Sequence, residues 1–338
     1  MSRPSNEKQH TAPVPPDAPA DAAGRPIRIG ISTCLLGVAV RYDGGHKRDP
    51  FLTDGLARFV EWAPVCPEVE MGMSIPREAI RLAGDPDNPR LVTVRTGVDH
   101  TEAMRRFSDR RLRELEALDL SGYVLKKDSP SCGMARLRVY HEHGVPARIG
   151  VGMFARALME RFPLLPVEEE GRLRDLPLRE NFIERVFGYW RWQDLVRDRW
   201  SRGGLVAFHT AHKYLLMAHG PQHYRALGAR VAGAKTVPPA ELRHWYGRQF
   251  MQALQVKATP RKHVNVLHHM LGYFKRHLSP EEKQELLSLI EDYRRGLAPL
   301  VVPVTLIKHY VAKYDAQYLA GQVYLNPHPK ELMLRNHV

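Results

Sequence analysis

The residues best suited to chemistry in this chain are three cysteines, Cys34, Cys66 and Cys132. Cys34 follows the β-rich run of residues 27–33, and Cys132 lies in a polar loop after the apolar residues 123–125. Strands and helices are expected to alternate here, and in a parallel sheet the carboxyl ends of the strands meet at one edge, where ligands bind. We therefore expect the three thiols to share one site.

Three thiols restrict what such a site can hold. A structural zinc ion usually has four protein ligands, and no Cys-x-x-Cys pair is present, so a zinc ribbon is disfavoured. A cubane iron–sulfur cluster with three thiolates would leave one iron open to solvent or substrate. An odd number of cysteines without an export signal also argues against a disulfide framework. The alternative is three unconnected buried thiols.

Groups that transfer protons or form hydrogen bonds lie close to these cysteines in sequence. Glu68 follows Cys66 by two residues, and Ser129 and Ser131 precede Cys132. A carboxylate can act as a general base on water, and a hydroxyl can hold water or substrate. The alternatives are that Glu68 caps or orients its loop, that Ser129 is a turn residue, and that Ser131 supports the turn or the group the thiols hold.

Three further side chains are candidates for contacts with the base or phosphate of a substrate. They are Arg41 and Tyr42, which follow Cys34, and Lys126, which opens the loop that leads to Cys132. The alternative is that these side chains are simply solvated on loops.

Length and composition predict two domains. The chain has 338 residues, of which 43% are apolar and 26% charged, more than one typical core holds. Residues 1–25 are rich in proline and alanine and lack a signal-peptide core, so we expect a disordered tail and a cytoplasmic protein without a membrane span. Residues 26–168 predict an α/β domain with a mostly parallel sheet. Residues 178–332 predict an all-α domain, and the charged, glycine-broken segment 166–172 is expected to act as the linker.

The charge of the chain is divided unequally between these halves. Residues 1–170 hold 24 basic and 24 acidic side chains, whereas residues 171–338 hold 26 basic and 13 acidic ones with 12 of the 17 histidines. A basic domain of this kind indicates a polyanionic partner, most plausibly nucleic acid. The alternative is a basic domain with no such partner.

One helix of the second half is the best candidate for phosphate contacts. The helix expected over residues 260–278 has an apolar face, and its other face carries basic residues without acidic partners. The candidates are Arg261, Lys262, His269, Lys275 and Arg276. A zinc site among His209, His212, His219 and His223 is conceivable, but it lacks a clear carboxylate or thiolate ligand.

The motifs around the cysteines resemble those of a known family. Residues 27–166 resemble the thiouracil desulfidase (TudS) family in three separate motifs. These are Thr33–Gly37 with Val40–Gly44, Cys66–Glu68, and Ser129–Gly133. Residues 180–330 resemble the YbgA-type domain in helical character and domain order. Together the two domains resemble the tRNA 4-thiouridine desulfidases.

The resemblance implies a Rossmann-like domain with a 4Fe-4S cluster ligated by Cys34, Cys66 and Cys132, one iron having no protein ligand. It implies catalytic roles for Glu68 and Ser129, and tRNA containing 4-thiouridine as the partner and substrate, converted to uridine without net electron transfer. Two rival functions remain open: a desulfidase of free thiolated bases or nucleosides, and a non-catalytic iron–sulfur regulator that binds RNA. The resemblance gives no oligomeric state and no final acceptor of the sulfur.

Overall fold

The computed structural model describes residues 24–140 and 146–337, so nearly all of the tail expected at residues 1–25 lies outside the described residues. The chain divides into two compact units, Met1–Gly171 and Arg172–Val338. Within the described parts, none of the helices combines the length and the apolar character needed to cross a bilayer.

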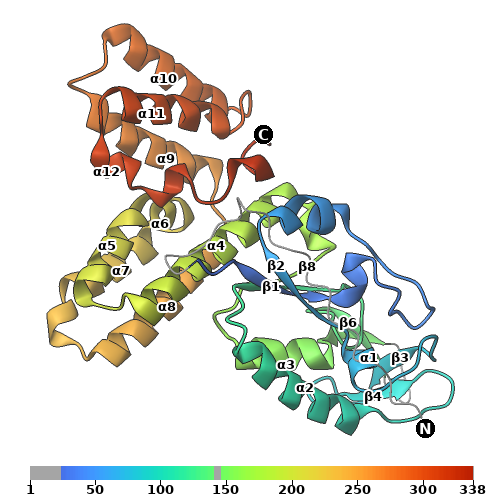
Figure 1. Cartoon of the computed structure of the whole chain (residues 1–338). Helices are drawn as coiled ribbons and strands as arrows, with labels where there is room; N and C mark the ends of the chain where they lie inside the picture. The colour runs from blue at the N-terminus through green and yellow to red at the C-terminus, as the bar shows by residue number, and fades with distance from the viewer. Residues whose placement is uncertain (1–23, 141–145, 338) are drawn as a thin grey trace. The chain divides into compact units, whose positions relative to one another are not determined.

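The first unit contains the expected parallel sheet. Its four strands pair in the order β2-β1-β5-β8, and every neighbouring pair is parallel. The strands are β1 (Arg28–Ser32), β2 (Glu61–Val65), β5 (Gly122–Leu125) and β8 (Val167–Glu169). Because β1 lies between β2 and β5, the loops that follow these three strands leave the sheet side by side (Figure 1). The predicted α/β fold is confirmed.

Two helices pack together against this sheet: α2 (Thr101–Glu116) and α3 (Met153–Arg161). The ring of Phe154 on α3 contacts Phe107 of α2 and Tyr123 of β5, with ring centroids 6.0 and 6.1 Å apart. Gly30 of β1 makes room for Tyr123, since a Cβ at Gly30 would stand 2.1 Å from its ring. Any larger residue at position 30 would therefore displace the central strand pair that carries the cysteine loops.

A second sheet in the same unit was not predicted. Its strands pair in the order β4-β3-β6-β7, and only the pairing of β3 with β6 is parallel. They are β3 (Ile80–Ala83), β4 (Arg90–Thr93), β6 (Leu137–Tyr140) and β7 (Ala147–Gly150). The apolar run at residues 91–94 falls mostly in β4, which pairs with β3 in this mixed sheet. Strands of four residues with partly exposed side chains leave little periodicity in the sequence.

The segment 166–172 contains the boundary between the two units, but part of it is a strand of the first unit and not a linker. Val167–Glu169 form β8, the edge strand of the parallel sheet, and Glu168 and Glu169 are buried. Three consecutive glutamates read as a solvated charge run, but two of them are buried. The two units separate between Gly171 and Arg172, inside this segment.

The second unit is all-helical in its regular structure, as predicted (Figure 1). Its helices are α4 (Leu176–Asp198), α5 (Arg202–Ala211), α6 (Lys213–His219), α7 (Pro221–Ala232), α8 (Pro239–Gln255), α9 (Pro260–Leu271), α10 (Pro280–Arg294), α11 (Val301–Lys313) and α12 (Gln317–Ala320). Residues 205–219 are divided between α5 and α6. A capping box joins Ser279 and Glu282 at the start of α10.

Candidate functional site

The three cysteines lie in the segments that follow the adjacent parallel strands β1, β2 and β5. Cys34 lies in the 3-10 turn η1 (Thr33–Leu36) after β1, and Cys66 directly follows β2 as the N-cap residue of the short helix α1 (Pro67–Glu70). Cys132 lies in the loop after β5. Cys34 and Cys132 are buried and Cys66 is half-buried. The sequence prediction that these thiols gather at one sheet edge therefore agrees with the structure.

The thiols lie close enough to influence one another's ionisation. Burial, with a further contribution from the neighbouring Cys66, raises the pKa of Cys34 to about 11. Burial also raises the pKa of Cys66 and, most strongly, that of Cys132, to which the charges of Cys66 and Cys34 add. Ionising three neighbouring buried thiols without a cation is energetically unfavourable, and a bound metal centre would stabilise the thiolate forms.

The spacing of the thiols does not match that of a single-ion site. Among the described residues, the three sulfurs do not form a set in which all ligand atoms lie within 4.8 Å of one another. A single tetrahedral ion draws its ligands into such a set, whereas a cubane takes each thiolate on a different iron. Buried thiols from separate loops around a shared space are a donor set that suits an iron–sulfur cluster.

The Cys132 loop is held by the start of α3. The N–H groups of Gly152 and Met153 donate to the carbonyl oxygens of Gly133 and Pro130 at 2.8 and 3.1 Å, and the N–H of Phe154 donates to Ser131 O. A Cβ at Gly152 would stand 2.6 Å from Ser131 O, so only glycine permits this approach. The unpaired donors of a helix N-terminus thus fix the backbone beside Cys132.

Glu68 is placed at the site by two side chains from distant parts of the chain. Arg77 donates from Nε and Nη2 to Glu68 Oε2 at 2.9 and 2.5 Å, and the hydroxyl of Ser131 donates to Oε1 at 2.9 Å. The side chains of Arg77 and Glu68 are only 4% and 13% exposed. Arg77 Nη2 also donates to Val40 O at 3.0 Å, which joins the Glu68 pair to the loop after Cys34.

The two serines of the Cys132 loop have different contacts. Ser129 Oγ accepts hydrogen bonds from the N–H groups of Ser131 and Cys132 at 3.3 and 3.1 Å, so Ser129 shapes the turn that carries the thiol. Its own hydroxyl proton can still be donated to a substrate. Ser131 is fully buried and binds Glu68, so it links the Cys66 and Cys132 loops.

The other side chains predicted to contact substrate differ in exposure and in the hydrogen bonds that hold them. Lys126 is engaged, because its Nζ lies 2.5 Å from Glu170 Oε1 and donates to Lys127 O. Its charge nevertheless lowers the pKa of Cys34, as does that of Arg41, so both cations face the thiol site. The Tyr42 ring is 44% exposed, and Arg41 lies 5.6 Å from its centroid. Arg41 and Tyr42 thus lie at the rim of the site, whereas Lys126 forms part of its wall.

Sequence reasoning missed Arg77 and Glu170. Arg77 lies nine residues beyond Glu68 in a segment without regular structure, and no spacing rule joins the two. Glu170 accepts from the N–H of Lys127 as well as from Lys126, and Glu169 accepts from Met134 N at 2.7 Å. The end of β8 therefore supports the Cys132 loop on both sides. A Lys-Lys pair and a glutamate run far apart in sequence gave no signal for this contact.

Comparisons with known proteins identify both units. Residues 29–170 match the family model 2-thiouracil desulfurase, and residues 213–329 match DUF1722, a family of unknown function. The chain belongs to the 2-thiouracil desulfurase family. Its desulfurase-family domain is followed by a DUF1722 domain. The recognised pairing of the two domains is confirmed.

Individual relatives cover one part of the chain each. The uncharacterized protein YbgA of Escherichia coli is 36% identical over 166 residues, which are 46% of this chain and 94% of that protein. The uncharacterized protein YbbK of Bacillus subtilis is 30% identical over 110 residues, 31% of this chain and 72% of YbbK. A solved structure of the 4Fe-4S-dependent thiouracil desulfidase TudS is 33% identical, covering 46% of this chain and 97% of TudS, with a TM-score of 0.37.

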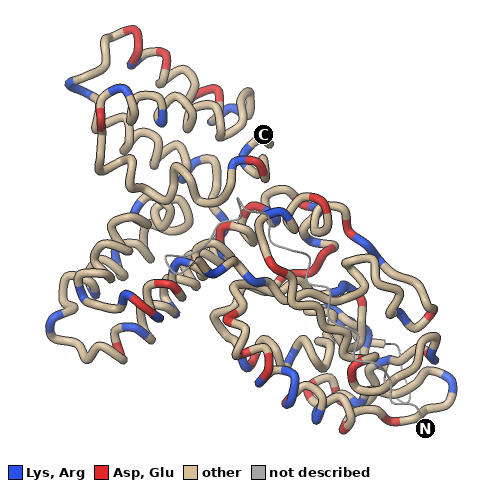
Figure 2. The backbone as a smooth tube through the Cα atoms, viewed as in Figure 1, with Lys and Arg blue, Asp and Glu red and all other residues tan. Residues whose placement is uncertain are grey.

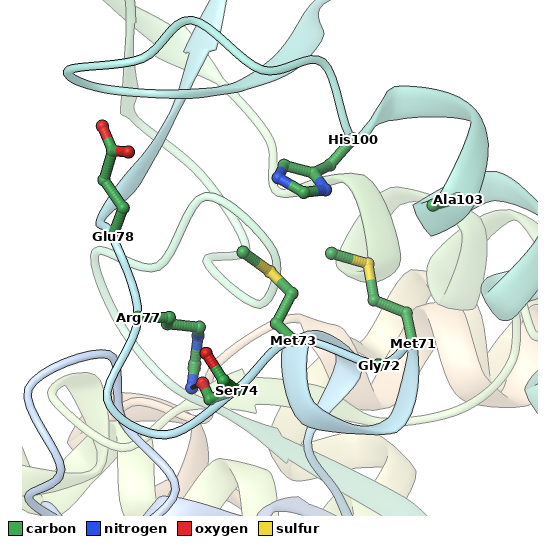
Figure 3. A pocket seen from close by; sticks show the side chains of 8 residues that line it. All are labelled: Met71, Gly72, Met73, Ser74, Arg77, Glu78, His100 and Ala103. Atoms are coloured by element: carbon green, nitrogen blue, oxygen red, sulfur yellow. Dashed lines mark hydrogen bonds between the residues drawn. The ribbon is translucent and has the colours of Figure 1, made fainter.

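A pocket of about 430 Å³ adjoins the thiol site of the desulfurase-family unit. Figure 3 shows Met71 and Met73 side by side, with the ring of His100 facing their thioethers and Arg77 at one end. Arg77 therefore borders this pocket and binds Glu68 as well. Met71, Met73 and His100 belong to none of the motifs described in the sequence.

In the DUF1722 unit the predicted row of basic residues on α9 is broken. Arg261 and His269 are exposed, but Lys262 is half-buried, and its Nζ donates to His219 O at 2.6 Å and to Lys257 O at 3.3 Å. The prediction that Lys262 contacts phosphate is therefore not supported. The helix ends at Leu271 before Gly272, so the exposed Lys275 and Arg276 lie beyond it and do not continue its face.

The four histidines considered for zinc do not converge. His209 Nδ1 lies 3.0 Å from the Tyr246 hydroxyl, His212 Nδ1 lies 2.7 Å from Phe208 O, and His219 Nε2 lies 3.1 Å from Glu184. In the described part of the chain the one set with metal-like spacing is Glu180, Glu184 and His328, and Arg335 donates to both of its carboxylates. Three of the histidines considered for zinc, His209, His212 and His219, belong to the core of the unit.

Proposed function

We propose that this protein is a desulfidase that converts 4-thiouridine in tRNA to uridine, with a 4Fe-4S cluster held by Cys34, Cys66 and Cys132. The observation that carries the proposal is the meeting of these thiols at the ends of adjacent parallel strands, with Glu68 fixed beside them. A non-catalytic regulator would have no use for a carboxylate oriented by a buried arginine and a buried serine.

The three thiolates would each hold one iron. A cluster with three protein ligands supplies an open iron, a Lewis acid that accepts the sulfur of the substrate. The remaining chemistry falls to side chains of this chain. Replacement of sulfur by oxygen at a thiocarbonyl carbon needs a water molecule, a group that takes its proton and a group that orients it.

Glu68 is the proton acceptor in this proposal. Arg77 and Ser131 fix its carboxylate, so one oxygen can take a proton from water as the water attacks the base carbon. The same carboxyl then returns the proton to the ring nitrogen or to the departing sulfur. Ser129 accepts two backbone N–H bonds and directs its own hydroxyl proton to the oxygen of the water or the base.

The charge of the DUF1722 unit supports RNA as the substrate. From Arg199 to Pro280 the chain holds 13 lysines and arginines and a single acidic residue, Glu241. The acidic residues of this unit gather elsewhere, notably on α10, where Figure 2 shows them in red. An almost acid-free stretch of 82 residues, spanning α5 to α9, can bind a phosphate backbone without repulsion.

The test uses the full chain reconstituted with iron and sulfide without oxygen. We expect about four irons per chain and loss of the thiocarbonyl absorbance of tRNA that contains 4-thiouridine. Cys132→Ser is the matched control, because it removes one ligand and keeps the size of the side chain. Affinity for tRNA should fall with salt, with a slope of roughly 0.9 per phosphate contacted.

Two outcomes would overturn parts of the proposal. A fully loaded protein that leaves both thiolated tRNA and free 4-thiouracil unchanged is not a desulfidase. A loaded protein that processes free 4-thiouracil but neither binds nor changes tRNA is a desulfidase of free bases, and the basic unit then has another role.

A further inference from the structure

Four tyrosines from separate elements meet on the DUF1722 unit. They are Tyr214 of α6, Tyr224 of α7, Tyr273 of the turn η6 (Gly272–Phe274) and Tyr318 of α12. The rings of Tyr273 and Tyr318 are stacked, with centroids 5.3 Å apart and planes 9° apart. Burial raises the pKa of Tyr214 and of Tyr318, and the neighbouring Tyr273 hydroxyl contributes to both shifts, so the three hydroxyls lie close together. We call Tyr273 and Tyr318 the tyrosine pair.

The tyrosine pair is exposed although it is ordered by these contacts. Tyr273 is 44% and Tyr318 38% exposed, whereas Tyr214 beneath them is buried. Large aromatic residues at helical spacing usually belong to the core, as Phe250 and Tyr246 do in this unit. Two parallel rings held at the surface by hydroxyl contacts offer a rigid, flat, apolar face to a ligand.

One cation lies beside the tyrosine pair, and three more follow these tyrosines closely in sequence. Lys213 Nζ lies 5.8 Å from the ring centroid of Tyr318 and 5.1 Å from that of Tyr214. Exposed Arg225 follows Tyr224 in sequence, and exposed Lys275 and Arg276 follow Tyr273 closely. Asp315, the acidic residue next to α12, accepts a hydrogen bond from Gln317.

We infer that the tyrosine pair is a stacking platform for an unpaired nucleobase of RNA, with Lys213, Lys275 and Arg276 contacting the flanking phosphates. The inference deepens the proposed function, because it names the place where the tRNA is bound. Proteins that bind single-stranded RNA combine aromatic rings, which stack on splayed bases, with cations along the backbone. Here the three cations and Tyr273 lie within the nearly acid-free stretch of the unit. Tyr318 lies outside that stretch in sequence and stacks on Tyr273.

The experiment measures the affinity of the cluster-loaded full chain for tRNA that contains 4-thiouridine, for Tyr273→Ala and Tyr318→Ala. Loss of a base stack on an aromatic ring should weaken binding about 5- to 150-fold. Tyr273→Phe keeps the ring and is expected to stay within about threefold of the parent protein, a difference below 1 kcal/mol. Leu297→Ala, at a residue 65% exposed in the same unit, is the control and should leave affinity unchanged. Desulfuration of free 4-thiouracil should be unaffected in all four variants.

The outcomes separate this inference from the proposed function. Unchanged tRNA affinity in both alanine variants overturns the platform and leaves tRNA desulfuration standing. A loss in Tyr273→Phe as large as in Tyr273→Ala also overturns it, because the hydroxyl and not the ring would then matter. A parent protein without affinity for tRNA overturns both the platform and the choice of tRNA, while activity on free 4-thiouracil would still support the desulfidase.

Discussion

Replacing Arg77 by leucine is the most direct test of how Glu68 is held. The change removes both hydrogen bonds from Arg77 to Glu68 Oε2 and its hydrogen bond to Val40 O. The hydroxyl of Ser131 still donates to Glu68 Oε1. Leucine fills much of the volume of the arginine stem, so the main effect is electrostatic. The expected result is a buried carboxylate without its cation.

The size of the effect follows from burial. The side chains of the pair are 4% and 13% exposed, so solvent can do little to screen the lost partner. Breaking a buried ion pair by removing one member costs about 3–5 kcal/mol. For a unit of this size each kcal/mol lowers the melting temperature by about 2–4 °C, so the unfolding of the first unit should shift down by about 6–20 °C.

The assay is thermal unfolding of the full chain, and the quantity compared is the melting temperature of the transition of the first unit. Adding Glu68→Gln to Arg77→Leu removes the unpaired charge and should restore at least about 1 kcal/mol, the desolvation cost of a single polar group. Arg161→Leu is the matched control, because its pair with Glu116 is about half exposed and should contribute less than about 1 kcal/mol. If the double variant is no more stable than Arg77→Leu alone, the buried charge is not the cause.

Three further predictions concern the cluster, catalysis and pH. Cys34→Ser and Cys66→Ser should each lose the iron content and the colour of the loaded protein, measured by iron and sulfide assay. Glu68→Gln should keep the iron and lower the rate on free 4-thiouracil by at least about 100-fold, the low end for general acid–base help; an unchanged rate would make Glu68 structural. Burial lowers the pKa of His212 to about 3, below its unfolded value of 6.5. Its stabilising contribution is therefore complete above pH 6.5 and falls by about 1.4 kcal/mol per pH unit toward pH 3. Chemical denaturation between pH 7 and 4 should show a shallower decline in His212→Gln.

The parts of the fold that could be predicted are those that leave local patterns. The strand β1 contains β-branched isoleucines, β5 is a short apolar run, and Ser279-Pro280 with Glu282 is a local start signal for α10. The second sheet could not be found, because its strands are short and pair across long separations, as Leu82 does with Val139. The end of α9 was missed because the apolar spacing continues through Phe274 while the backbone tightens at Gly272.

At the candidate site, the reactive side chains could be predicted from the sequence, whereas the side chains that hold them in place could not. The cysteines and Glu68 are recognisable because each lies beside a proline or glycine turn after an apolar run. Arg77 and Glu170 were not recognisable, because a charged side chain shows its partner only when the fold brings the two together. Lys262 shows the converse: its position on the helix predicted exposure, but it lies against carbonyl oxygens of neighbouring segments.

The place of β8 in the chain determines when the thiol site can be completed. All three cysteines are synthesised before residue 133, yet the strand whose end supports the Cys132 loop is the last strand of its unit. Until Glu169 and Glu170 have emerged from the ribosome, Met134 lacks its contact with Glu169 and Lys126 lacks its contact with Glu170. A nascent chain therefore carries its three thiols before it has the complete pocket for them, so cluster loading is expected to follow emergence of the whole first unit. A truncation that ends before Pro166 would keep every cysteine and still fail to retain iron.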